Sequence, residues 1–116
     1  MTNILCVTSL RDGQSIIPIE FIAVKEAEKK FQRAAVVLSE FAGCNRSLGG
    51  TLKVNPFNVE EITKTLDTAL QISEEEKEQR MNRAFTFIKQ RTTPKWSENF
   101  IKDLKRHSTK SPDTVF

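Results

Sequence analysis

The stretch "AAVVLSE" at residues 34–40 is a short and nearly continuous run of apolar residues. A similar run, "NILCVTS", stands at residues 3–9, and a shorter one, "TLKVNP", at residues 51–56. Short runs that are rich in Val, Ile and Leu suit strands covered on both faces, as in parallel sheets. The sequence therefore predicts about three parallel strands.

The segment between the first two runs has the periodicity of a helix. Within "SIIPIEFIAVKEAEKKFQ", at residues 15–32, the apolar positions at helical spacing are Ile16, Ile19, Ala23, Ala27 and Phe31. Pro18 is compatible with this helix because it falls in the first turn. The order strand, helix, strand predicts an α/β fold with a Rossmann-like parallel sheet.

The second half of the chain carries signals for three further helices. Asn58 and Ser73 each stand three residues before a glutamate, which is the spacing of a capping box, and Thr93-Pro94 predicts an N-cap followed by a first-turn proline. The expected apolar stripes are Val59, Ile62, Leu66 and Ala69, then Met81, Ala84, Phe85 and Ile88, then Trp96, Phe100 and Leu104. A sheet has about five strands on average, so residues 1–107 predict a partial domain, followed by a disordered tail at 108–116.

Composition excludes several classes of function. The chain has 116 residues, 38% of them hydrophobic and 28% charged, which indicates one small globular domain. No stretch reaches the roughly 20 apolar residues that span a bilayer, and no secretory leader is evident, so we expect a cytoplasmic protein without a membrane partner. Two distant cysteines do not predict a zinc site. The basic residues near the C-terminus favour a solvated helix end over a nucleic-acid interface.

The bend "SLRDGQS" at residues 9–15 is a candidate anion site. It follows a predicted strand, and ligands of parallel α/β sheets bind beyond the carboxyl ends of the strands. Gly13 would let the backbone approach a ligand, and the amides of Gln14, Ser15 and Ile16 would be unpaired at the start of the helix. Free N–H groups at the positive end of a helix dipole suit a phosphate.

Two carboxylates flank this bend. Asp12 could accept hydrogen bonds from sugar hydroxyls, and Glu20 lies eight residues later, a little over two helical turns, where it could hold a ribose. The segment could thus bind the parts of a nucleotide sugar. On spacing alone an alternative stays open, in which Asp12 is an N-cap, Gly13 a turn residue and Glu20 a solvated helix residue.

Three further motifs, "LSEFAG" (38–43), "SLGG" (47–50) and "VNPFN" (54–58), add a resemblance to a known family. Over residues 4–105 the chain resembles the C-terminal end of trehalose-6-phosphate synthases. This resemblance implies a retaining GT-B glycosyltransferase, which moves glucose from UDP-glucose to glucose 6-phosphate without a metal or other cofactor. The chain would then be part of the domain that binds the nucleotide sugar.

The resemblance also implies roles for individual residues. Asp12 would be the catalytic residue and hold a hydroxyl of the donor glucose, Gly13 would lie against the donor, the amides of residues 14–16 would meet the diphosphate, and Glu20 would hold the ribose. The sequence "QSI" at residues 14–16 departs from the family's Met-Asn-Leu, which alters side-chain contacts while backbone donation is kept.

Other parts of the expected enzyme would lie outside this sequence. The resemblance implies an arginine and a lysine that neutralise the diphosphate, and an acceptor pocket, all upstream of Met1, so we expect the isolated chain to be inactive. The expected partners are UDP-glucose and an N-terminal acceptor domain or other trehalose synthase subunits, with the terminal helix packing toward the acceptor domain. The alternative is a non-catalytic regulatory or interaction subunit of a trehalose synthase complex, since "DGQSI" also resembles the divergent branch of the family.

Overall fold

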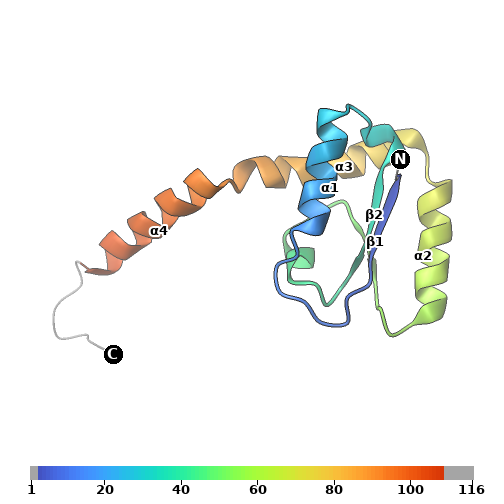
Figure 1. Cartoon of the computed structure of the whole chain (residues 1–116), viewed down its shortest axis with the longest axis horizontal. Helices are drawn as coiled ribbons and strands as arrows, with labels where there is room; N and C mark the ends of the chain where they lie inside the picture. The colour runs from blue at the N-terminus through green and yellow to red at the C-terminus, as the bar shows by residue number, and fades with distance from the viewer. Residues whose placement is uncertain (1–2, 109–116) are drawn as a thin grey trace.

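The protein is a three-stranded parallel sheet with helices on both faces, seen in a computed structural model that describes residues 3–108 (Figure 1). The strands have the order β1-β2-β3, with Ile4 opposite Ala35 and Val37 opposite Leu52. The elements are β1 (Ile4–Val7), α1 (Ile17–Ala27), η1 (Phe31–Arg33), β2 (Ala35–Ser39), η2 (Gly43–Arg46), β3 (Leu52–Val54), α2 (Val59–Gln71), α3 (Glu74–Gln90) and α4 (Thr93–Ser108). The predicted α/β class and the three parallel strands are confirmed.

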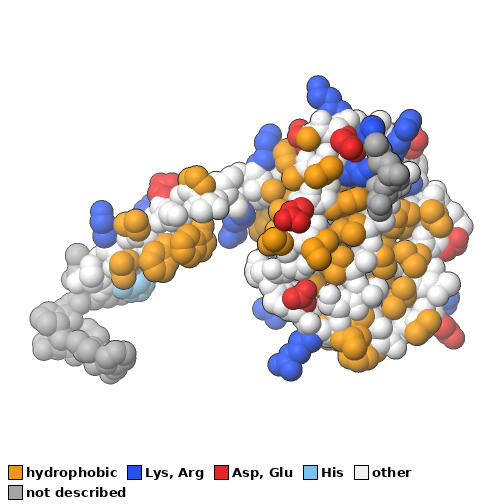
Figure 2. Space-filling model, viewed as in Figure 1, with side chains coloured by type: hydrophobic (Ala, Val, Ile, Leu, Met, Phe, Trp, Pro, Cys, Tyr) orange, Lys and Arg blue, Asp and Glu red, His pale blue; other side chains and the backbone are white. Residues whose placement is uncertain are grey.

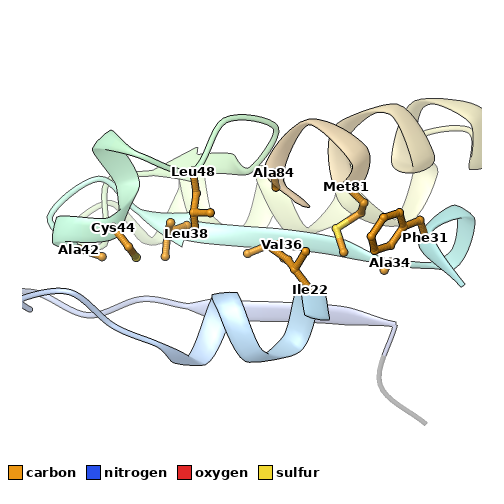
Figure 3. Packing of buried hydrophobic residues seen from close by; sticks show 10 residues of the cluster. All are labelled: Ile22, Phe31, Ala34, Val36, Leu38, Ala42, Cys44, Leu48, Met81 and Ala84. Carbon is orange, nitrogen blue, oxygen red and sulfur yellow. The ribbon is translucent and has the colours of Figure 1, made fainter. Parts of the chain in front are cut away.

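The central strand β2 is buried along its whole length because helices cover both of its faces. Val36 and Leu38 point into a cluster that α1 and α3 cover (Figure 3), whereas Ala35 and Val37 point toward α2 on the other face. Successive side chains of a strand alternate between faces, so an unbroken apolar run is what two covered faces require. Each fully buried Val or Leu side chain stabilises the fold by about 1.5–3 kcal/mol.

Helix α1 is shorter than predicted and buries a different face. It begins at Ile17 rather than near residue 15, and it ends at Ala27, two residues before Lys29 adopts a positive φ of 54°. The buried residues of α1 are Pro18, Ile22 and Lys25, so the predicted stripe was wrong for three of its five members. Ile19 is half-buried against the core and Phe31 is buried from η1, but the other predicted members, Ile16, Ala23 and Ala27, are exposed.

A lysine takes a core position on this face. The side chain of Lys25 is 4% exposed, its ammonium lies 3.6 Å from a carboxylate oxygen of Glu28, and it stands 5.7 Å from the ring centre of Phe21. A lysine stem can cover apolar surface while its charge stays paired. Apolar periodicity cannot reveal such a residue, which is why the sequence placed the buried stripe elsewhere.

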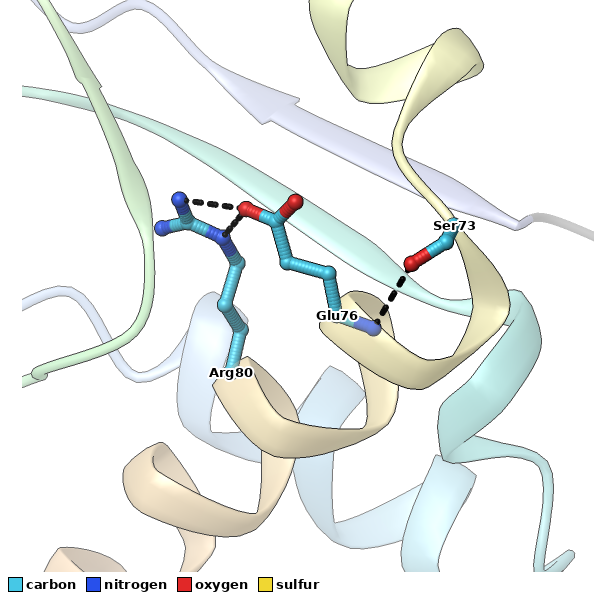
Figure 4. Close-up of polar contacts among 3 residues, drawn as sticks. All are labelled: Ser73, Glu76 and Arg80. Carbon is cyan, nitrogen blue, oxygen red and sulfur yellow. Dashed lines mark hydrogen bonds and ion pairs between the residues drawn. The ribbon is translucent and has the colours of Figure 1, made fainter.

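The starts of α2 and α3 were predicted correctly. The side chain of Asn58 accepts a hydrogen bond from the amide of Glu61 at 3.1 Å. The side chain of Ser73 accepts one from the amide of Glu76, also at 3.1 Å (Figure 4). Such caps each stabilise a helix by about 1 kcal/mol. The Glu76 carboxylate does not return to its cap but binds Arg80 at 2.8 Å.

The predicted stripes of these two helices are largely confirmed. Met81 and Ala84 of α3 are buried, and Phe85 and Ile88 pack against them from its partly exposed flank. On α2, Ala69 is buried and both Ile62 and Leu66 pack against the second cluster. Val59 is an exception, because it is the first residue of α2 and is 73% exposed.

Helix α4 projects away from the body of the molecule and buries none of its residues (Figures 1 and 2). It begins at Thr93, so this residue lies inside the helix rather than at its cap. Trp96, Phe100 and Leu104 are each more than half exposed, and the first two rings stack at 5.2 Å. No helix in residues 3–108 is long and apolar enough to cross a membrane. Apart from Ser108, the predicted tail lies outside the described residues.

Candidate functional site

Two loops meet at the carboxyl ends of β1 and β2: the first loop (residues 8–16) and the second loop (residues 40–51) (Figure 1). They are joined by a parallel β-bridge between Asp12 and Ala42, and by a hydrogen bond that the Gly43 amide donates to the Gly13 carbonyl at 2.8 Å. Closer to the sheet, the Ser39 hydroxyl donates to the Ser9 carbonyl at 2.6 Å. The first loop, which carries most of the predicted site, is therefore held by the second.

The predicted amide donors precede helix α1 instead of opening it. The N-cap residue is Ile16, and no side chain caps the helix. The Glu20 amide already donates to the Ile16 carbonyl at 2.9 Å, and Pro18 has no N–H, so the first-turn donors are Ile17 and Ile19. These two residues are not among the predicted donors, although Pro18 marks the first turn of the helix in the sequence.

The three predicted amides have different surroundings. The Ser15 residue is buried, and its amide meets the sulfur of Cys44. Burial raises the pKa of the Cys44 thiol above its usual range. The backbone N–H groups of Cys44 and Ser15 act to lower this pKa, and the negative charge of Asp12 acts to raise it. Within residues 3–108 no acceptor meets the amides of Gln14 and Ile16, and both residues are exposed. Two of the three predicted donors thus stay open.

Both predicted carboxylates are exposed to solvent. Asp12 lies four residues before the N-cap of α1, so it does not cap this helix as the alternative interpretation required. Glu20 lies in the first turn of α1. In the part of the chain that the structure describes, neither side chain forms an ion pair. Both carboxylates are therefore available to a ligand.

The protein's own structure does not require a glycine at position 13. A Cβ atom added to Gly13 would have no neighbour within 4 Å, and Gly50 is the only described glycine with a positive φ. A side chain would fit here in the unliganded chain. A close approach of a ligand to the backbone would account for the glycine.

The chain has a partial Rossmann-like sheet with an open loop at the carboxyl end of its first strand. Its fold class is therefore part of a GT-B glycosyltransferase fold. The chain belongs to glycosyltransferase family 20, whose family model matches residues 1–106.

Relatives with sequence similarity are trehalose-phosphate synthases. The chain is 43% identical over 103 residues to the probable UDP-forming alpha,alpha-trehalose-phosphate synthase 4 of Arabidopsis thaliana, covering 88% of this chain and 12% of that protein. It is 38% identical to the UDP-forming synthase of Pichia angusta, covering 90% of this chain and 21% of that protein. The chain thus spans only a small part of these relatives.

Solved structures of trehalose-phosphate synthases have the same fold as this chain over the matched region. The UDP-forming alpha,alpha-trehalose-phosphate synthase of Burkholderia xenovorans matches with a TM-score of 0.82 at 29% identity, over 93% of this chain and 23% of that one. An E. coli protein solved with UDP-2-fluoro glucose bound matches with a TM-score of 0.81 at 34% identity, over 90% of this chain and 22% of that one. These matches support the fold over nearly the whole chain.

Proposed function

We propose that this chain supplies the donor-binding half of a trehalose-6-phosphate synthase, which transfers glucose from UDP-glucose to glucose 6-phosphate in trehalose biosynthesis. The observation that carries the proposal is the first loop, which is exposed at the carboxyl end of β1 with two open amides between two unpaired carboxylates. Membership of family 20 and the E. coli relative with a bound UDP-sugar support it.

Each part of a nucleotide sugar has a matching group in this loop. The diphosphate would accept hydrogen bonds from the amides of Gln14 and Ile16, next to the positive end of the α1 dipole. Asp12, as the proposed catalytic residue, would accept hydrogen bonds from the glucose hydroxyls, and Glu20 would hold those of the ribose. No step of this binding requires a metal ion or an organic cofactor.

The acceptor-binding half is assigned to an N-terminal acceptor domain that packs against the exposed stripe of α4. Trp96, Phe100 and Leu104 are the residues of this stripe, and each is more than half exposed in the part of the chain that the structure describes. An amphipathic helix with an exposed aromatic face is suited to burial against a partner surface. We propose that the protein acts in the cytoplasm.

The carboxylates are tested by titrating UDP-glucose into the chain by isothermal calorimetry. Asp12→Ala and Glu20→Ala are each expected to weaken binding about tenfold or more, because hydrogen bonds to charged groups contribute about 1.5–3 kcal/mol. Glu26→Ala is the matched control, since it removes an exposed carboxylate of the same helix, and it should bind like the unchanged chain. If neither Asp12→Ala nor Glu20→Ala changes the affinity, the proposed site is wrong.

A second test uses Gly13→Ala. The added methyl group has no protein neighbour within 4 Å, so the free energy of unfolding should change by less than about 1 kcal/mol. Affinity for UDP-glucose should nevertheless fall about tenfold, because the methyl group would stand where the ligand approaches the backbone. Thermal unfolding and calorimetry on the same samples separate the two quantities. Unchanged affinity would remove Gly13 from the site.

A further inference from the structure

Residues 42–44 of the second loop contact the first loop at three successive positions. Ala42 forms the β-bridge with Asp12, the Gly43 amide donates to the Gly13 carbonyl, and Cys44 lies beside the amide of Ser15, both residues being buried. Cys44 is 1% exposed and belongs to the buried cluster around β2. The first two contacts join the main chains of the two loops at consecutive residues, and the third, between Cys44 and Ser15, is buried.

Gly43 allows this approach because it lacks a side chain. A Cβ atom at Gly43 would lie 2.6 Å from the Gly13 carbonyl oxygen and 3.0 Å from its carbonyl carbon. Those atoms belong to the backbone, which cannot move aside as the end of a flexible side chain could. Any larger residue at position 43 must displace the first loop.

The hydrogen bond from Gly43 also orients the next donor of the first loop. The peptide bond between Gly13 and Gln14 is trans, and in a trans peptide the carbonyl and the following N–H point in nearly opposite directions. Because the Gly13 carbonyl faces Gly43, the Gln14 N–H faces away from the second loop. It is therefore directed to the exposed side, where no protein acceptor meets it.

We propose that Ala42, Gly43 and Cys44 form a positioning element for nucleotide-sugar binding, in which Gly43 sets the direction of the Gln14 amide and Cys44 fixes the loop through Ser15. The ligand part of this inference rests on the function proposed above. These residues do not touch the donor. They act by holding the peptide groups that do, so that no reorganisation is needed when the diphosphate arrives.

The experiment compares Gly43→Ala with Gly49→Ala in the full chain. Gly49 is a matched control in the same loop, because an added Cβ would lie 3.3 Å from the flexible Arg83 side chain and near no backbone atom. In ligand-free ¹H–¹⁵N spectra, Gly43→Ala should shift the amides of residues 12–16, and Gly49→Ala should not. Affinity for UDP-glucose should fall about tenfold or more in Gly43→Ala alone, because small misplacements of binding groups are costly.

The two measurements separate this inference from the proposed function. If the unchanged chain does not bind UDP-glucose, the proposed function fails, while the ligand-free spectra still decide whether Gly43 positions the loop. Unshifted amides at residues 12–16 in Gly43→Ala would overturn the positioning role, and so would shifted amides with unchanged affinity. Should Gly43→Ala fail to fold, Cys44→Ala removes the sulfur beside the Ser15 amide without adding volume. Cys44→Ala should also shift the amide signals of residues 12–16. Unchanged amide signals in this variant would overturn the inference.

Discussion

Gly50→Ala is expected to lower the free energy of unfolding by about 3 kcal/mol or more, because backbone strain and a steric clash act at the same residue. Gly50 has a φ of +86°, a region that residues with a Cβ rarely adopt. The added methyl group would also overlap with the carbonyl oxygen of Arg80 on α3. Since Met81, next to Arg80, is buried in the core, α3 cannot move away without disturbing the packing.

Thermal unfolding followed by circular dichroism measures this effect. A loss of about 3 kcal/mol corresponds to a drop in Tm of roughly 10 °C or more in a domain of this size. Gly49→Ala is the control, because it meets only the side chain of Arg83 and its φ is not positive. Equal melting temperatures for the two variants would show that the contact between Gly50 and α3 is not rigid.

Ile22→Ala is expected to destabilise the protein by about 2–5 kcal/mol through loss of apolar burial and the cavity left behind. Ile22 is fully buried and joins α1 to the cluster formed by β2 and α3 (Figure 3). Val24 lies on the same helix and is 56% exposed, so Val24→Ala is a matched control with an expected change below about 1 kcal/mol. Urea unfolding compares the two variants.

The Ile22→Ala variant also tests whether ligand binding depends on the core packing of α1. Glu20 is exposed and lies two positions before Ile22 on α1, so the core mutation should leave Glu20 in place while the chain stays folded. Well below its Tm, Ile22→Ala should therefore bind UDP-glucose like the unchanged chain. A parallel loss of affinity and stability would mean that Glu20 depends on the core packing of α1.

The sequence predicted the features that depend on local patterns. The apolar run at residues 34–40 predicted a strand covered on both faces, and β2 is such a strand. Asn58 and Ser73 predicted the starts of α2 and α3, because a cap is a contact between residues three apart. The remaining strands and helices were predicted from equally local patterns, namely two further apolar runs, the helical periodicity of residues 15–32 and the pair Thr93-Pro94.

Features that depend on distant contacts could not be predicted. The pairing of Gly13 with Gly43 joins residues that are thirty positions apart, and no periodicity signals it. The same contact placed Ser15 against Cys44 and so changed the surroundings of one predicted donor. Lys25 was missed for another reason, since a charged residue is assigned to the surface unless its buried partner is known.

The order of the strands has a practical consequence for handling the protein. Strand β1 pairs with β2 on one side only, and no other described strand covers its outer side. Such an edge offers unsatisfied N–H and C=O groups to any extended peptide, including another molecule of the same sequence. We therefore expect concentrated samples of the chain to aggregate through such an edge, and dilute solutions suit the measurements above.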